Sequence, residues 1–392
     1  MNAPVTTEEP TNNSRRRFMF IFILFLIAGI TIIIVVRGLN VNAERLFIDN
    51  QDLSIYYARG EWSIIGAPPL SEYPQIPTLL FGIDRLLSAW IGPGMPFKVF
   101  ASLFSMEMLV VLFLVIKVLL EVLPKGLSRY TSLMLLPPVL YFTYNRFDIL
   151  PAYLCLLAFS AAARKRWTMV SIVLAIAAFT KWYPVLLIPG FIIYASTLEM
   201  RFQWKMIIYF LITSIAIVLI SYIYGGLETV LAPYQYQMAV KMDIEAFPAL
   251  VYNLLQGLSH TQIGLREYFL VLLLIQLSGP ILIIFIKLDS ADALMHYCIL
   301  VTSIFILFSR IWSPQWFLWI LPFLILSTKN MKTAGLLIAY ALTTYLCFPL
   351  FFDYFGKYSD QLKYSCLVTY FILCIIILRS IANLKFSGIL HR

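Results

Sequence analysis

Long apolar runs are the feature that most restricts how this 392-residue chain can fold. Residues 18–36 read FMFIFILFLIAGITIIIVV and residues 267–286 read EYFLVLLLIQLSGPILIIFI. Each reaches the roughly 20 residues that carry a helix across the hydrocarbon core of a bilayer. Soluble chains are about half apolar and about a quarter charged, whereas this one is 61% hydrophobic and 12% charged. The sequence therefore predicts an all-α, polytopic membrane bundle.

Hydropathy predicts about twelve spans. They are 18–36, 96–120, 130–144, 148–163, 167–181, 183–197, 205–223, 267–287, 294–309, 314–328, 333–352 and 364–379. The proline-containing pieces LMLLPPVLYFTYN and WYPVLLIPGFIIYA are expected to be broken or half-inserted, which a protein-lined cavity tolerates. Residues 76–95 are apolar but contain Asp84 and Arg85, so an amphipathic helix lying at the outer interface is expected there. We expect residues 1–17 to be a disordered cytoplasmic tail and residues 18–392 to be one membrane domain.

The charge distribution orients the predicted spans. A net charge of +9 could suggest a nucleic-acid partner, but membrane proteins gather Lys and Arg in their cytoplasmic loops. Placing successive loops on alternate sides of the membrane puts RRR (15–17), ARKRW (163–167) and most other cations inside. The positive charge is therefore better explained by membrane topology than by binding of nucleic acid. Both termini are then cytoplasmic, and the first span, too long for a signal-peptide core, is a retained anchor. The stretch 38–75, NRFD, KWYP, the loop 224–266 and SRIWSPQW all fall outside.

A metal or cofactor is not indicated by the cysteines or histidines. The five cysteines lie inside apolar segments without the spacing of metal ligands, as buried thiols do. The three histidines are spread over the chain and form no sequence cluster. We therefore predict no cofactor and no metal site.

A polar stretch after the first span holds the candidate catalytic acids. Asp52 begins the motif DLSIYY near the expected membrane surface, where aromatic neighbours can desolvate a carboxylate and raise its basicity. Such a base can take a proton from a sugar hydroxyl. The alternative is that Asp49, Asp52 and Glu61 only solvate an exposed loop. Asp52 and Asp49 both remain candidates for the base.

Cations at the ends of outer spans are candidates for binding a phosphate. Arg146 in NRFD, Lys181 in TKWYP and Arg310 in SRIWSPQW lie where an unpaired charge is costly. Lysine offers a compact point charge and arginine a two-pronged fork, and both suit a lipid phosphate. The alternative is that these side chains reach out from helix ends towards water. Arg146 could also serve a structural role by pairing with Asp148.

Aromatic residues are dense beside these charges. Most of them fit the interfacial belt of membrane proteins, while a few could stack on sugar rings. The residues that we expect to bind substrate are Tyr56, Tyr57, Glu72, Tyr73, Trp182, Tyr183 and Gln315. Glu72 is in addition a second candidate acid.

Four motifs together resemble the GT-C superfamily of membrane glycosyltransferases. They are DLSIYY (52–57), YNRFDILPAYLCLLAF (144–159), FTKWYPVLLIPGFIIY (179–194) and SRIWSPQWFLWILPFLIL (309–326). The likeness is closest to the polyprenyl-phosphate-mannose-dependent mannosyltransferases of the DUF2029 (GT87) type.

The resemblance implies inverting transfer of a hexose, which is mannose in that family, from a polyprenyl-phosphate sugar to a glycolipid or glycan at the outer face of the cell membrane. It maps the catalytic acid onto Asp52. Some related branches carry an acidic doublet in this loop, whereas this chain reads N-Q-D at 50–52, so a paired-carboxylate or metal-assisted mechanism is in doubt.

The competing hypothesis is a transporter or flippase of a lipid-linked sugar. Transporters usually place ionisable groups near the midplane and show two related halves. Here the polar residues gather at one predicted face, Glu107 is the exception, and no such halves are visible. A third hypothesis is a polymerase or ligase that uses a pyrophosphate donor, but the sequence contains no separate motif that favours it.

Overall fold

A computed structural model describes residues 50–64, 71–258 and 264–385. Over these ranges the chain is helical and has no β-strand, which confirms the all-α class. The α-helices are α3 (Asn50–Ile64), α4 (Gln75–Ile91), α5 (Pro96–Val122), α6 (Pro137–Asn145), α7 (Ile149–Ala163), α8 (Trp167–Thr180), α9 (Ile188–Glu199), α10 (Trp204–Ala239), α11 (Phe247–Leu258), α12 (Leu265–Ile281), α13 (Ala291–Phe308), α14 (Phe317–Leu326), α15 (Met331–Tyr345), α16 (Phe352–Phe355) and α17 (Asp360–Asn383). Short turns of 3-10 or π-helix are η1 (Ser128–Leu135), η2 (Tyr183–Leu187), η3 (Leu282–Phe285), η4 (Pro314–Trp316) and η5 (Leu346–Phe351).

The predicted spans coincide with helices wherever the structure describes them. In that part of the chain 6 helices are long and apolar enough to cross a membrane, or up to 7 if the bent pair α6 and α7 forms one span. Three further predicted spans are shorter apolar helices, at Trp167–Thr180, Tyr183–Glu199 and Pro314–Leu326. The predicted first span, 18–36, and the tail before it lie outside the described residues. The structure thus supports a multi-pass membrane protein, but it does not confirm twelve crossings.

Sharp bends interrupt two of the apolar segments. Helices α6 and α7 meet at 106°, and the residues at the bend are Arg146, Phe147 and Asp148. The bend follows the piece LMLLPPVLYFTYN, and within that piece the 3-10 helix η1 ends at Leu135 and α6 begins at Pro137. Within α10, Gly225 and Gly226 leave the helical conformation, and Gly226 has a φ of 71°. A glycine pair is a common cause of a kink, because only glycine adopts positive φ at little cost.

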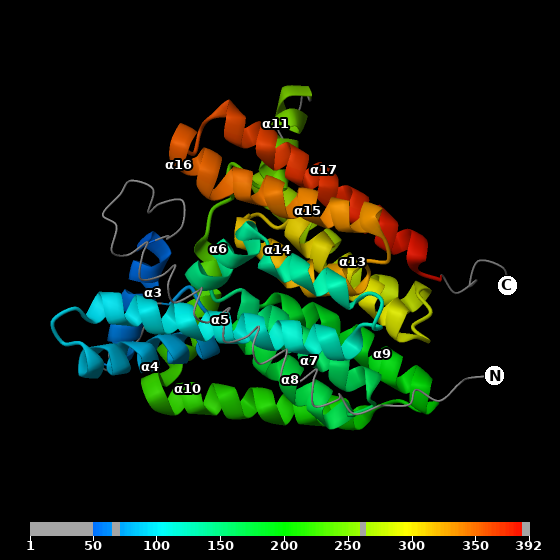
Figure 1. The fold of residues 1–392 in the computed structure, drawn as a ribbon, viewed down its shortest axis with the longest axis horizontal. Helices are drawn as coiled ribbons and strands as arrows, with labels where there is room; N and C mark the ends of the chain where they lie inside the picture. Colours follow the sequence, from blue (N-terminus) through cyan, green and yellow to red (C-terminus); the bar gives the residue numbers. More distant parts are fainter. Residues whose placement is uncertain (1–49, 65–70, 259–263, 386–392) are drawn as a thin grey trace. The chain divides into compact units, whose positions relative to one another are not determined.

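The buried interior is formed by α7, α13 and α14 (Figure 1). Every residue of α14 from Phe317 to Leu326 is buried, and α14 packs on both α7 and α13. Helix α7 also packs on α5 and α8, and α13 packs on α12 and α17. By contrast, α10 and α12 leave most of their apolar side chains exposed. Exposed apolar helices beside a fully buried one are what a bundle surrounded by lipid requires.

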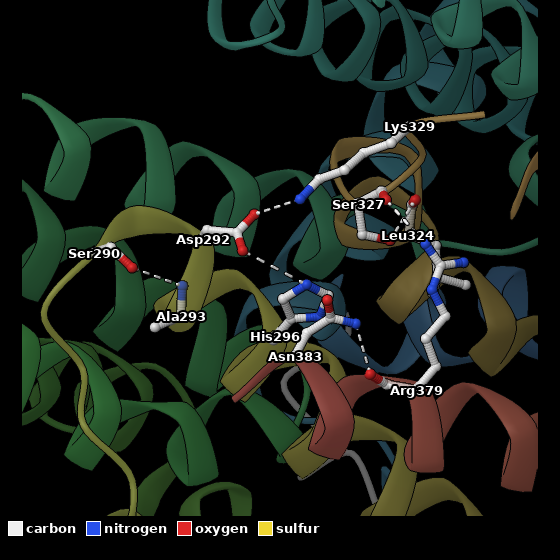
Figure 2. A network of polar contacts seen from close by, with 9 residues as sticks. All are labelled: Ser290, Asp292, Ala293, His296, Leu324, Ser327, Lys329, Arg379 and Asn383. Carbon is white, nitrogen blue, oxygen red and sulfur yellow. Dashed lines mark hydrogen bonds and ion pairs between the residues drawn. The ribbon is translucent and has the colours of Figure 1, made fainter. Parts of the chain in front are cut away.

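One end of α13, α14 and α17 is joined by a polar network (Figure 2). Asp292 lies 3.8 Å from His296 Nε2 and 3.5 Å from Lys329 Nζ, measured from its two carboxylate oxygens. Arg379 of α17 donates a hydrogen bond to the carbonyl of Ser327, which follows α14. These contacts lie at the start of α13 and near the end of α17. They tie the three helices together at the end that is remote from residues 308–314 and 360–362.

Helix α3 is held against α4 by a close backbone approach. Gly60 is buried, and a Cβ at this position would lie 2.3 Å from the carbonyl oxygen of Phe81 in α4. Helix α3 also contacts α5 and α6. The absence of a side chain at Gly60 therefore sets the distance of α3, and with it the place of Asp52, from the rest of the bundle.

Gly60→Ala is expected to destabilise the protein by ~1–3 kcal/mol, because the added methyl group must push α3 away from backbone atoms that cannot rotate aside. Gly335→Ala is the matched control, since a Cβ there meets nothing within 4 Å and alanine favours a helix. Thermal unfolding in detergent should show a lower midpoint for Gly60→Ala alone. Equal midpoints for the two variants would contradict the close packing of α3 on α4.

A buried carboxyl pair joins α4 to α5. Asp84 is fully buried in α4, and Glu107 of α5 lies beside it. Burial, followed by repulsion from the Glu107 carboxylate, raises the pKa of Asp84 from its ordinary 3.8 to about 8. Asp84 is therefore protonated at neutral pH in the folded protein. The amphipathic helix expected at 76–95 is thus present as α4, with one acidic side chain turned into the protein.

Asp84→Asn is expected to raise the unfolding midpoint at pH 8 and to leave it nearly unchanged at pH 4. A raised folded pKa means that the contribution of Asp84 to stability is full below pH 3.8 and is lost as the pH rises towards about 8. The neutral amide avoids that loss, and each ~1 kcal/mol should appear as a shift of ~2–4 °C. Unfolding curves of both proteins across this pH range provide the test. A midpoint gap that does not widen with pH would contradict the buried, protonated state.

Candidate active site

A cavity of about 190 Å³ lies where segments far apart in the sequence meet. Its walls come from α3, the α6–α7 bend, the segment between α10 and α11, the segment before α14, and the region from η5 to the start of α17. The lining residues are Asp52, Arg146, Asp243, Glu245, Trp312, Ser313, Pro314, Gln315, Cys347, Phe348, Phe352, Lys357 and Leu362. The structure thus brings together segments that the sequence predicted to share one face.

The central polar contact of the cavity is an ion pair between Asp52 and Arg146. Asp52 lies in the first turn of α3 and its side chain is 26% exposed, whereas that of Arg146 is 5% exposed. The guanidinium of Arg146 also lies 5.6 Å from the centroid of the Phe348 ring. Arg146 follows the last residue of α6 in an extended conformation, which turns its side chain out of the helix. A carboxylate and a cation therefore face the same space.

Asp148, on the other side of the bend, forms a separate buried network. Its Oδ1 accepts a hydrogen bond from Trp319 Nε1 at 2.8 Å and lies 3.3 Å from Lys181 Nζ. The Lys181 ammonium also lies 4.4 Å from the centroid of the Phe147 ring. The ion-pair partner that we find for Asp148 is thus Lys181, and for Arg146 it is Asp52. Both Lys181 and Asp148 are neutralised inside the protein.

Arg310 orders the segment between α10 and α11. Its guanidinium donates to the carbonyl of Gln237, the third-last residue of α10. Its own backbone carbonyl accepts a hydrogen bond from the Asp243 backbone N–H at 2.9 Å. The Asp243 carboxylate in turn accepts from the Trp312 backbone N–H at 3.3 Å. These contacts join the two polar segments that wall the cavity. Neither Arg310 nor Lys181 is among its lining residues.

Asp243, Glu245 and Lys357 are cavity residues that the sequence analysis did not single out. Lys357 Nζ lies 4.0 Å from Asp243 and 3.9 Å from Glu245. Burial raises the pKa of both carboxyls, and the Lys357 charge opposes that rise. The Glu245 backbone carbonyl accepts a hydrogen bond from the Tyr370 hydroxyl at 2.5 Å. The signal in the sequence was the pair of acids in KMDIEAF (241–247), within the loop 224–266 that is expected outside.

Most of the aromatic residues expected to bind substrate pack inside the protein. Tyr56 and Tyr183 are each 1% exposed. Tyr56 stacks on Phe81 with centroids 4.6 Å apart, and Tyr73 packs edge-on against Tyr56. Tyr183 stacks on Trp319 at 4.3 Å. None of these tyrosine rings lines the cavity.

The other residues expected to bind substrate also contact neighbouring side chains, with one exception. Tyr57 lies under the Arg85 guanidinium, 4.3 Å from its ring centroid, and Glu72 forms an ion pair of 2.7 Å with Arg59. Trp182 packs on Tyr234 with centroids 4.5 Å apart. Of the residues expected to bind substrate, Gln315 is the one that lines the cavity. Asp49, the second candidate base, lies outside the described residues.

The polar groups of the cavity can support proton transfer and anion binding. Asp52 can accept a proton, and Arg146 and Lys357 can neutralise a phosphate. The described part of the chain contains no group of three or more His, Cys, Asp and Glu side chains arranged to hold a metal ion.

Asp148→Asn is expected to destabilise the protein by ~3–5 kcal/mol, because it leaves the Lys181 charge buried without its partner. The double change Asp148→Asn with Lys181→Met removes both charges and should recover much of that loss. Thermal unfolding of the two single variants and the double variant measures this coupling. Additive losses in the double variant would mean that the buried pair does not exist.

Residues 142–381 match the family model described as Mannosyltransferase (PIG-M). The matched range contains Arg146, Lys181, Arg310 and every residue of the cavity except Asp52. No curated protein matches the chain. The match confirms the expected mannosyltransferase character, while the DUF2029 (GT87) subtype stays a prediction.

Proposed function

The chain belongs to the PIG-M mannosyltransferase family, and we propose that it transfers a mannosyl residue from a polyprenyl-phosphate donor to a glycolipid or glycan acceptor in the cavity of Asp52 and Arg146. The observation that carries this proposal is the convergence of a carboxylate and two cations, Arg146 and Lys357, on one small cavity. General-base assistance and neutralisation of a leaving phosphate need these two kinds of group.

The location of the cavity supports a lipid-linked donor. Alternating the sides of the predicted spans puts every cavity-lining segment at the outer face, and both termini inside. Nucleotide sugars are cytosolic, so an enzyme that works outside requires a donor that the membrane itself can carry. A polyprenyl phosphate meets this requirement, and the exposed apolar helices beside the bundle are compatible with a lipid chain.

The proposed reaction is an in-line displacement at the sugar C1. Asp52 takes the proton of the acceptor hydroxyl while the acceptor oxygen forms a bond to C1. The bond from C1 to the phosphate oxygen breaks, and the phosphate leaves with that electron pair. Arg146 and Lys357 neutralise the charge that develops on the leaving phosphate. Displacement from the opposite side inverts the configuration at C1.

The Asp52–Arg146 ion pair gives the donor a way to activate the base. While the two side chains are paired, the guanidinium occupies the carboxylate. A phosphate that enters the cavity competes with Asp52 for the fork of Arg146. Donor binding would thereby release Asp52 for the acceptor hydroxyl, so that the base becomes active when a sugar is in place.

Lys181 and Arg310 are proposed as positioning residues. Lys181 fixes Asp148 in the interior, which sets the bend that presents Arg146. Arg310 holds the backbone of Asp243 and the carbonyl of Gln237. Both cations therefore support the cavity through other residues, and substitutions at either position should lower stability as well as activity.

Family membership favours an enzyme over a transporter or flippase. Glu107 is the acidic residue that does not fit the gathering of polar residues at one predicted face. The structure pairs it with Asp84, and because Asp84 is protonated, the two carboxyls can share a buried site. Detergent-purified protein has no two compartments, so turnover of a polyprenyl-phosphate mannose in detergent separates the two functions. Mass spectrometry of membrane glycolipids, with and without the protein, would identify the donor residue and the product together.

Asp52→Asn is expected to lower kcat by ~10²- to 10⁴-fold, because the amide cannot accept the acceptor proton. Donor affinity should be kept, since Arg146 loses its charged competitor. The assay is mannose transfer by purified protein, with donor binding measured separately. Asp360→Asn is the matched control: Asp360 is exposed, pairs with Lys363 at 3.2 Å and lies outside the cavity lining. Wild-type turnover by Asp52→Asn would refute the assigned base.

A further inference from the structure

A second, open cleft of about 620 Å³ lies at the end of α8 remote from Lys181. It is bordered by the turn between α7 and α8 and by the turn between α9 and α10. Helix α8 is 14 residues long, or about 21 Å at the usual rise, so the cleft is well separated from the active-site end of the same helix. Mannose transfer, as proposed above, makes no use of this cleft.

Four cations line the cleft and no acidic residue does. They are Lys165, Arg166, Arg201 and Lys205. All four are exposed, and no ion pair joins them to any acid among the described residues. Glu199 lies nearby, but it accepts a hydrogen bond from Trp167 Nε1 at 3.2 Å and is not part of the lining. The cleft therefore concentrates positive charge that no described side chain neutralises.

The turns that present these cations have an uncommon backbone. Lys165 and Met200 are the non-glycine residues with positive φ in the described part of the chain, at 57° and 52°. Lys165 lies two residues after the end of α7 at Ala163, and the Arg166 N–H donates to the Ala161 carbonyl at 2.9 Å. Left-handed backbone is unfavourable for a non-glycine residue and tends to persist at functional sites. Lys165 itself lines the cleft, and Met200 directly precedes Arg201, which also lines it.

Helix ends and apolar side chains complete the arrangement. Helices α8 and α10 begin at Trp167 and Trp204, beside the cleft, and the first N–H groups of a helix attract anions. Met200 and Trp204 are 91% and 66% exposed, and the Phe202 and Trp204 rings lie 4.5 Å apart. Helix α10, which runs along α8, is an apolar candidate span with little of its surface buried in the protein (Figure 1). The cations thus border a surface suited to lipid chains.

We infer that this cleft binds the phosphate headgroup of an anionic phospholipid. The cations and helix N-termini fit a phosphate, and the exposed apolar side chains beside them fit its acyl chains. The charge pattern of the sequence puts the same two turns on the cytoplasmic side, where anionic lipids are abundant in many membranes. A lipid headgroup there would anchor the ends of α8 and α10 opposite the cavity.

Lipid binding can be measured by native mass spectrometry of the full-length protein in detergent. Phosphatidylglycerol, phosphatidylcholine and glycerol phosphate are titrated separately. Wild type should retain phosphatidylglycerol in preference to phosphatidylcholine. Arg166→Gln with Lys205→Gln should weaken phosphatidylglycerol binding ~10- to 30-fold. Removing one cation near a headgroup weakens lipid binding by up to about tenfold. Folding of the variant is checked by its unfolding midpoint.

Lys117→Gln with Lys332→Gln is the matched control, because both lysines are exposed, are predicted on the same side of the membrane and lie outside the cleft. The control should bind phosphatidylglycerol like wild type. Equal binding of the two phospholipids, or equal losses in the two double variants, would overturn the site. Binding of glycerol phosphate as tight as that of phosphatidylglycerol would overturn the lipid as its ligand and identify a site for soluble phosphates. These results do not depend on mannose transfer, so the two proposals can fail separately.

Discussion

The bend between α6 and α7 is the constraint on which the cavity depends. Over Arg146, Phe147 and Asp148 the chain turns by 106° and sends one cation to the cavity and one carboxylate to the interior. Each charge meets an opposite charge, Asp52 on one side and Lys181 on the other. Burying an unpaired charge costs several kcal/mol, so the pairings fix which residue points inward. Through them the α6–α7 bend is joined to α3, α8 and α14.

The sequence predicted the helices better than the partners of their polar residues. Hydropathy located the apolar helices because each needs a long run of nonpolar side chains whatever it packs against. The alternation of inner and outer loops likewise grouped the stretches that now surround the cavity. Such patterns report polarity, and they carry no information on which of several nearby charges will pair. That is why the sequence indicates Lys181 and Arg310 as phosphate ligands, whereas the structure pairs Lys181 with Asp148 and joins the Arg310 guanidinium to the Gln237 carbonyl.

The aromatic residues show the same limit. Tyr56 and Tyr183 stand beside charged residues in the sequence, as a sugar-stacking ring would, yet both are buried against other rings. Whether an aromatic side chain faces a cavity or the core depends on the rotation of its helix, which short motifs do not determine. Conversely, Asp243, Glu245 and Lys357 lie in loops whose course depends on tertiary contacts, such as that from Tyr370 to the Glu245 carbonyl. Their convergence with Asp52 could be found only in three dimensions.

The carboxylates that line the cavity outnumber its cations. Asp52, Asp243 and Glu245 face Arg146 and Lys357, and burial already favours the protonated forms of Asp243 and Glu245. An anionic donor that enters this space adds a further negative charge, which raises the proton affinity of those two carboxyls. If the cavity takes the anionic donor proposed above, linkage requires that donor binding be accompanied by proton uptake, so that mild acidity at the cavity would strengthen donor binding.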